Sequence, residues 1–262
     1  QSFYSIVYEG AANSTAGPDV AALPPAPVPS WTSSSTLTED AHFRGKEIDD
    51  DASPLALAFP MPFYGQMVQD VEMSSNGLIA MAPDGTTYRK GSDYYGHLPS
   101  EALPNGLLAA YWDDLACSAR SGCKLLTGQR AVGQNEAIAS CGHSNATIIQ
   151  YEDFAHRYDS SAVVSMEARL YADGCMEVQY ERFPGPSNRV AAKIGIETRS
   201  GRSGLNLAPV LPFGHERFGI MFVPFLAADP RRSAEAVNAG ATVDFHFHVE
   251  GYRSKQAWIM VR

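Results

Sequence analysis

From residue 55 onward the chain alternates between apolar and polar residues in short runs that are rich in valine, isoleucine, tyrosine and phenylalanine. Such two-residue periodicity is typical of strands that bury one face, and no long stretch has apolar residues at helical spacing. Glycine, proline and asparagine separate the runs at short intervals, which predicts an all-β, antiparallel, jelly-roll-like β-sandwich. A single short helix is expected at residues 231–238. The predicted strands cover residues 55–59, 70–75, 78–82, 107–112, 124–128, 137–141, 147–154, 162–172, 175–183, 189–198 and 217–226.

Two hairpin turns can be placed along this pattern. An Asn-Gly pair at residues 76–77 stands between apolar runs, and in that setting it is the strongest short-range hairpin signal. Farther on, a two-residue turn ending at Gly174 would mix apolar and polar side chains on one face of its hairpin. A three-residue loop at 172–174 pairs Leu170 with Met176 and restores a single apolar face. We therefore expect that loop, with Gly174 at a positive φ.

Composition divides the chain into four parts. Residues 1–54 hold a possible strand at 3–8 and a proline-rich stretch at 23–29, so we expect an extended arm with few regular hydrogen bonds. Trp31 and Phe43 are the apolar residues expected to attach this arm to the domain surface. The predicted sandwich covers residues 55–226, and a linker rich in alanine and charge follows at residues 227–240. Residues 241–262 are expected to form C-terminal strands that close the sandwich or begin a second module.

The formal net charge of −9 argues against a nucleic-acid partner and against binding to anionic membrane surfaces. The longest apolar run, residues 218–228, is about half of the ~20 residues that a membrane-spanning helix needs, so direct membrane insertion is not expected. The chain begins at Gln1 rather than at methionine. That start is expected either after removal of a signal peptide or in an excised fragment.

The cysteines and two glycosylation motifs favour the secretory pathway. The cysteines are Cys117, Cys123, Cys141 and Cys175. An even number permits two disulfides, with three possible connectivities, and buried free thiols are the alternative. The first two flank a short polar segment that a bond between them could staple, and the last two would then join two strand ends. Asn13 and Asn145 begin Asn-x-Ser/Thr acceptor motifs, so we expect a secreted or cell-surface glycoprotein.

Three motifs follow one another in a recognisable order. Residues 59–66 read FPMPFYGQ, residues 74–77 read SSNG, and residues 108–114 read LAAYWDD. In sequence and order they resemble the extracellular nidogen-type (NIDO) domain and the related domain of plexin-domain-containing surface proteins. The resemblance covers about residues 52–200, although Tyr151 stands where the family usually has tryptophan. It implies a β-sandwich of extracellular, matrix or adhesion proteins, and it brings no catalytic residues.

Asp113 and Asp114 are adjacent carboxylates, which on a strand would point to opposite faces. That is poor geometry for a cooperating acid and base. We expect one of them to cap the turn after Trp112 and the other to be solvated. The alternative is a calcium-ligand role, together with Asp84 or with the acidic residues 49–51, although the latter lack the spacing and the glycine of a calcium loop.

Two further groups of residues are candidate binding sites. His246 and His248 are two residues apart on one face of a predicted strand and could bind a transition metal with a third ligand. The alternative is a half-exposed strand with a polar face. Tyr88, Tyr94 and Tyr95 lie in a loop rich in glycine and charge, which suits protein or sugar recognition. The alternative there is that the tyrosines pack over the sandwich edge.

The sequence contains no nucleophile elbow, phosphate loop or dinucleotide fingerprint, so no enzyme activity is expected. These features favour a non-catalytic extracellular adhesion or structural module that mediates protein–protein assembly on a cell surface, matrix or filament. Its partners would be other extracellular proteins or copies of itself, added at an exposed strand edge, with no cofactor. One alternative is a lectin-like carbohydrate-binding module, assisted by calcium. A third hypothesis is a metal-dependent enzyme built on the His246 and His248 strand.

Overall fold

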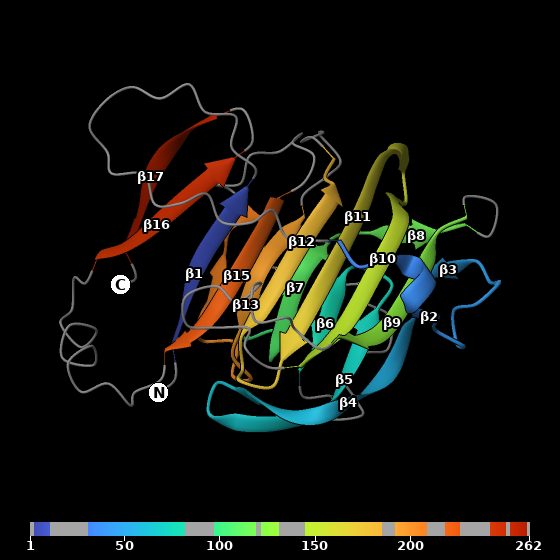
Figure 1. Ribbon diagram of the computed structural model, residues 1–262, viewed down its shortest axis with the longest axis horizontal. Helices are drawn as coiled ribbons and strands as arrows, with labels where there is room; N and C mark the ends of the chain where they lie inside the picture. The colour runs from blue at the N-terminus through green and yellow to red at the C-terminus, as the bar shows by residue number, and fades with distance from the viewer. Residues whose placement is uncertain are drawn as a thin grey trace.

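The computed structural model confirms the all-β sandwich. In the described residues the chain forms two antiparallel sheets that pack face to face, a separate hairpin, and one short 3-10 helix, η1, at Ser34–Thr36 (Figure 1). No α-helix occurs among these residues. The described residues are 3–10, 31–81, 97–118, 122–130, 145–184, 192–208, 218–225, 242–249 and 252–260.

The larger sheet is built from strands that come from both ends of the described chain. They are β1 (Phe3–Gly10), β2 (Thr38–Glu39), β3 (Ile48–Asp49), β8 (Leu115–Cys117), β9 (Lys124–Arg130), β10 (Ala146–His156), β11 (Asp159–Tyr171), β12 (Met176–Arg182) and β15 (Phe218–Phe225). Their order is β1-β15-β12-β11-β10-β8-β3, and β9 also pairs with β10 and carries β2 on its other side. The long strand β10 therefore has two partners on one side, β9 along its first part and β8 at its end.

The smaller sheet covers one face of the larger one. Its strands are β4 (Ala52–Phe63), β5 (Gln66–Ser74), β6 (Leu78–Ala80), β7 (Leu107–Trp112), β13 (Lys193–Glu197) and β14 (Gly204–Asn206), in the order β14-β13-β7-β6-β5-β4. The C-terminal strands β16 (Thr242–Val249) and β17 (Tyr252–Met260) form a hairpin of their own. Whether this hairpin begins a second module stays a prediction.

The main core lies between the sheets and is filled by alternate residues of the facing strands. Ile79 and Leu108 come from the smaller sheet, and Ile149 and Val178 from the larger one, and all four are fully buried. The predicted β11–β12 hairpin is confirmed. Leu170 pairs with Met176 across a three-residue loop that ends at Gly174, whose φ is +89°. The register could be predicted because a one-residue slip would turn every apolar side chain out of this core.

Residues 38–54 correct the predicted N-terminal arm. They do not form an extended arm, because β2 and β3 pair with β9 and β8 of the larger sheet. Phe43 and Ile48 are each 3% exposed and belong to the main core, so burial of these two apolar side chains draws the segment into the sandwich. The body of the sandwich therefore begins before residue 55. The expected strand near the N-terminus is present as β1. The predicted strand at 137–141 and the linker at 227–240, with its expected helix, lie outside the described residues.

The outer face of the larger sheet carries a buried polar network. The carboxylate of Glu167 accepts hydrogen bonds from the backbone N–H and hydroxyl of Thr32 at 3.0 and 2.8 Å and from the amide of Gln150 at 2.8 Å. Arg169 Nε donates to the same carboxylate at 2.6 Å, and its guanidinium also reaches Glu177 at 3.4 Å. Charges buried this deeply persist only when paired. The chain at Thr32 therefore lies over the sheet and is held there by polar contacts.

Candidate functional site

Two of the three sequence motifs, SSNG at residues 74–77 and LAAYWDD at residues 108–114, meet at one end of the sandwich, around the turn between β5 and β6. Asn76 in this turn is fully buried. Its amide nitrogen donates to Asp50 Oδ1 at 2.9 Å, and its amide oxygen accepts from the backbone N–H of Leu115 at 2.9 Å. One side chain thereby ties the end of β3 to the start of β8.

Gly77 completes the same turn and allows β7 to approach closely. Its φ is +73°, and a Cβ at this position would lie 2.1 Å from the carbonyl oxygen of Tyr111. The backbone N–H groups of Ala110 and Tyr111 both donate to the Gly77 carbonyl at 3.0 Å, which is the pattern of a β-bulge. Glycine is required here both for the conformation of the turn and for the space.

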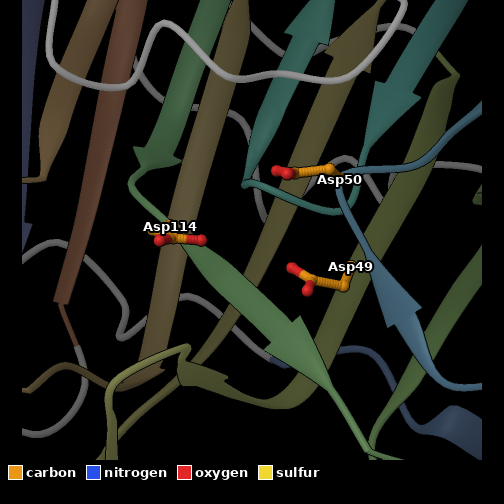
Figure 2. Close-up of side chains that lie close together, drawn as sticks. All are labelled: Asp49, Asp50 and Asp114. Atoms are coloured by element: carbon orange, nitrogen blue, oxygen red, sulfur yellow. The ribbon is translucent and has the colours of Figure 1, made fainter.

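Three carboxylates gather beside this turn. Asp49 ends β3, Asp50 follows it, and Asp114 precedes β8, and one carboxylate oxygen from each lies within 4.8 Å of the others. Figure 2 shows Asp49 and Asp50 reaching from one segment toward Asp114 on the other. Asp50 has a φ of +46°, a conformation that aspartate adopts more readily than most residues. The backbone of this segment therefore turns sharply at the cluster.

The cluster carries more negative than positive charge. Arg157 lies 3.1 Å from the Asp49 carboxylate through Nε and 4.0 Å from Glu47 through a terminal nitrogen. Burial raises the pKa of Asp49, Arg157 opposes that shift, and the nearby Asp50 and Glu47 add to it. Oxygen ligands at this spacing suit a hard divalent cation such as Ca²⁺, which takes six to eight oxygens at about 2.3–2.6 Å. The three carboxylates of the cluster offer oxygen ligands of the kind that such a cation takes.

The structure corrects the prediction for the two adjacent aspartates. Asp113 and Asp114 are only 4% and 5% exposed, so neither is solvated. Asp113 does cap the turn, because its Oδ1 accepts from the backbone N–H of Asp114 at 2.9 Å, and His156 Nε2 lies 3.8 Å from the same oxygen. The calcium alternative combined Asp113 and Asp114 with Asp84 or with residues 49–51. The structure joins Asp49 and Asp50 to Asp114, whereas Asp51 lies 2.8 Å from His42, and Asp84 falls outside the described residues.

Two residues of this site were not assigned from the sequence. Asn76 was visible only as part of a hairpin signal, and nothing marked its side chain as a buried link between strands. Arg157 stands in the turn between β10 and β11, far along the chain from Asp49. The signal that could have suggested Asn76 is the resemblance itself, because SSNG and YWDD are both motif segments and meet in space.

The other predicted site residues have mixed outcomes. The disulfide between Cys117 and Cys123 is confirmed, and it closes the loop after β8. Cys175 is also disulfide-bonded, but Cys141 lies outside the described residues, so its pairing with Cys175 stays a prediction. Asn145 is exposed immediately before β10, as a glycosylation acceptor must be, and Asn13 lies outside the described residues. Glycosylation at both positions stays a prediction.

The remaining candidates are not tested by the described residues. Tyr88, Tyr94 and Tyr95 lie outside them. His246 and His248 are two residues apart in β16, as the alternation predicted, but only the backbone of this strand is described. The recognition loop and the histidine metal site therefore stay predictions.

The described residues thus form an antiparallel β-sandwich with a disulfide-closed loop and a buried motif turn. The sequence matches the family model described as NIDO related over residues 29–211, well over half of the chain, so this chain belongs to the NIDO-related family. Neither a curated protein nor a solved structure matches it. Family membership and the Cys117–Cys123 disulfide suggest an extracellular module. Among the described residues, no helix is long and apolar enough to cross a membrane.

Proposed function

We propose that this chain is a non-catalytic extracellular module that mediates protein–protein assembly, with copies of itself or other extracellular proteins as partners. The observation that supports this most directly is the pairing of β1 with β15. All eight residues of β1 pair antiparallel with β15, from Phe3 opposite Phe225 to Gly10 opposite Phe218, at one end of the larger sheet (Figure 1). The edge strand of this sheet is thus supplied by the N-terminal segment.

This arrangement suits strand exchange between copies. Residues 11–30 connect β1 to the rest of the domain and include the proline-rich stretch at 23–29. A proline-rich segment extends by about 3.1 Å per residue and acts as a semi-rigid spacer. The β15 edge offers the same backbone partners to β1 of its own chain and to β1 of a neighbour, so exchange gains the same hydrogen bonds. The distance that residues 11–30 can span and the protein concentration then decide whether β1 pairs with β15 of its own chain or of a neighbour.

The opposite sheet has an edge that is protected from such addition. β4 is the edge strand of the smaller sheet and contains Pro54, Pro60 and Pro62. Proline has no backbone N–H to give to an incoming strand and is a common device for blocking an edge. The prolines therefore disfavour addition of a partner strand at β4.

The buried ionisable groups of the larger sheet support the non-catalytic assignment. Glu167, Arg169 and Glu177 bond to one another, and Tyr171 donates to Glu177 at 2.7 Å. Groups that satisfy one another in this way hold structure and leave no proton-transfer partner directed toward a substrate.

A cysteine pair across this ladder tests the proposal. Ser5 and Val223 are register partners, and residues directly opposite in an antiparallel ladder have Cα atoms about 4.5–5.5 Å apart, within disulfide range. In the Ser5→Cys, Val223→Cys protein we expect disulfide-linked dimers and higher multimers that increase with protein concentration. The single variant Ser5→Cys is the control. Only intramolecular crosslinks at every concentration, with wild-type protein monomeric by light scattering, would contradict self-assembly.

The Asp49, Asp50 and Asp114 cluster supports a second candidate property, a calcium-stabilised form of the module. Calcium would neutralise the repulsion among the three carboxylates and fix the β3 end against the β7–β8 turn. Its role would be structural, at the end of the sandwich where the SSNG and LAAYWDD motifs meet.

A further inference from the structure

A groove lies on the larger sheet near its β8 end, at the point where the pairing of β11 with both of its neighbours shifts register. It has a volume of about 330 Å³, at the lower end of the range for ligand pockets. One extra residue lies between Tyr151 and Phe154 of β10, and another lies between Tyr180 and Arg182 of β12. Such bulges bend a sheet and create local concavity. The lining of the groove includes Ala116, Asp153, Ala155, Arg157, Val163 and Arg182.

The floor of the groove is a small apolar patch that spans three strands. Ala155 of β10 pairs with Ala116 of β8 on one side and with Val163 of β11 on the other. All three residues are half-buried, so their methyl groups remain accessible from the groove. Small side chains in a row leave a flat surface on which the C–H face of a ligand ring can lie.

One wall of the groove is an ion pair with unused hydrogen-bonding capacity. Arg182 donates to Asp153 Oδ1 at 2.7 Å, and Ser165 Oγ donates to the same oxygen at 3.2 Å. No group among the described residues donates to Asp153 Oδ2. Asp153 lies in the bulge of β10 with a left-handed φ of +54°, and about half of its side chain is exposed. The wall thus offers both an acceptor oxygen and guanidinium N–H donors.

The other wall repeats this arrangement. Arg157 pairs with Asp49 and, more distantly, with Glu47, and its side chain is 42% exposed. At the base His156 is buried, and its Nδ1 accepts from the backbone N–H of Tyr158 at 3.2 Å. The ring of Tyr158 is 64% exposed and lies beside His156, with ring centroids 6.2 Å apart. The groove therefore has an exposed aromatic ring close to it.

The charges of the groove define the ligand that fits it. Two guanidinium groups, Arg157 and Arg182, stand against two lining carboxylates, Glu47 and Asp153. A small anion or cation would have to compete with an existing ion pair. A hydroxyl group can accept from a guanidinium and donate to a carboxylate at once, so it matches both walls without breaking either pair. An apolar floor between such walls suits a pyranose ring, which has apolar C–H faces and hydroxyl edges.

We propose that this groove binds a neutral carbohydrate, through hydroxyl contacts with Arg182, Asp153 and Arg157 over the Ala116–Ala155–Val163 floor. The site is distinct from the β15 edge and does not depend on assembly. A single module could therefore assemble through one edge of its sheet and hold a glycan at the other end.

The test uses the full chain and a fixed set of probes, which are neutral oligomers of glucose, mannose, xylose and N-acetylglucosamine, together with an oligomer of glucuronic acid. Binding is measured by titration calorimetry, and contact by saturation-transfer NMR. We expect at least one neutral probe to bind, and Arg182→Ala and Asp153→Asn to weaken it by about tenfold or more. Asparagine tolerates the left-handed φ of position 153, so this variant keeps the bulge. Val163→Trp fills the floor and should abolish binding.

The matched control is Arg202→Ala, which removes an exposed arginine from an ion pair with Glu101 outside the groove. It should bind as the wild type does. The proposal is overturned if no probe binds the wild type at millimolar concentration, if the charged oligomer binds best, or if the three groove variants bind as tightly as the control. Because strand exchange is followed separately by crosslinking, a failure here leaves the assembly result unaffected, and the reverse also holds.

Discussion

The side-chain amide of Asn76 donates a 2.9 Å hydrogen bond to Asp50 Oδ1, although the two residues are 26 positions apart in the chain. The link joins the β5–β6 turn to the segment after β3, and it places Asp50 next to Asp49 and Asp114. A turn that usually lies at the surface is here a buried tertiary junction. Its sequence is therefore constrained by contacts with distant residues as well as by the local backbone.

Replacing Asn76 with alanine should destabilise the fold strongly. The change removes the hydrogen bonds of the buried Asn76 side chain to Asp50 and to the Leu115 N–H and leaves a cavity, which together cost about 2–4 kcal/mol of unfolding free energy. The Leu115 N–H keeps the Asp113 carbonyl oxygen as an acceptor at 2.9 Å. Urea unfolding followed by tryptophan fluorescence measures this. Asn145→Ala, at an exposed position, should change stability by no more than about 0.5 kcal/mol. Equal effects of the two substitutions would contradict the structural role of Asn76.

Gly77→Ala should destabilise the protein far more than Gly45→Ala. Both glycines have similar φ values, +73° and +67°, so the backbone strain of about 1–2 kcal/mol is common to both substitutions. At Gly77 the added Cβ would also lie 2.1 Å from the Tyr111 carbonyl oxygen, whereas at Gly45 no atom lies within 4 Å. The difference in unfolding free energy should exceed about 2 kcal/mol. A thermal-unfolding comparison checks this, and similar melting temperatures for the two variants would argue against the close approach of β7.

Calcium should raise the melting temperature of the wild-type protein if the three carboxylates bind it. At a concentration about 100-fold above the dissociation constant, binding adds ~2.7 kcal/mol to stability. Asp114→Asn should abolish the increase, because it replaces one of the three clustered carboxylates by a neutral amide. The control is Asp70→Asn, at an exposed position of β5. Identical unfolding curves with calcium and with a chelator would rule out the site.

Glu197 should make stability depend on pH. Burial raises its pKa from 4.5 to about 7, against the opposing effect of the hydrogen bond from the Ser100 N–H at 2.9 Å. Between pH 4.5 and about 7 the folded protein holds this proton and the unfolded chain does not. The contribution of the neutral Glu197 carboxyl to the unfolding free energy is therefore fully present below pH 4.5 and is lost as pH rises toward 7.

The isosteric change Glu197→Gln should remove this dependence. At pH 8 the variant should be more stable than the wild type by about 1–3 kcal/mol, and near pH 4 the two should be equal. Unfolding free energies measured across this pH range provide the test. Glu101→Gln, in an exposed ion pair, is the control and should follow the wild-type profile. A wild type that is more stable at pH 8 than Glu197→Gln would show that the buried carboxyl is ionised at little cost.

Local periodicity was sufficient to predict most of the strands and the register of the β11–β12 hairpin. The pairing of Leu170 with Met176 follows from alternation alone, because any other register would place polar side chains in the core. The same logic could not place Phe43 and Ile48. Their segment is short and has no clear period, so its burial depends on distant strands, β8 and β9, that offer an edge and an apolar surface.

The candidate sites depended on the tertiary structure to a greater degree. Asp49 and Asp50 reach Asp114 only because two connections of the sandwich meet at the same end, and sequence distance carries no information on such meetings. The burial of the polar face of β11 likewise could not be predicted from the sequence. The sequence by itself determined that Glu167 and Arg169 lie opposite the apolar face, since side chains alternate along a strand. Only the tertiary structure decided that this face is buried beneath the chain at Thr32, because covering a sheet requires a segment from elsewhere whose donors match its carboxylates.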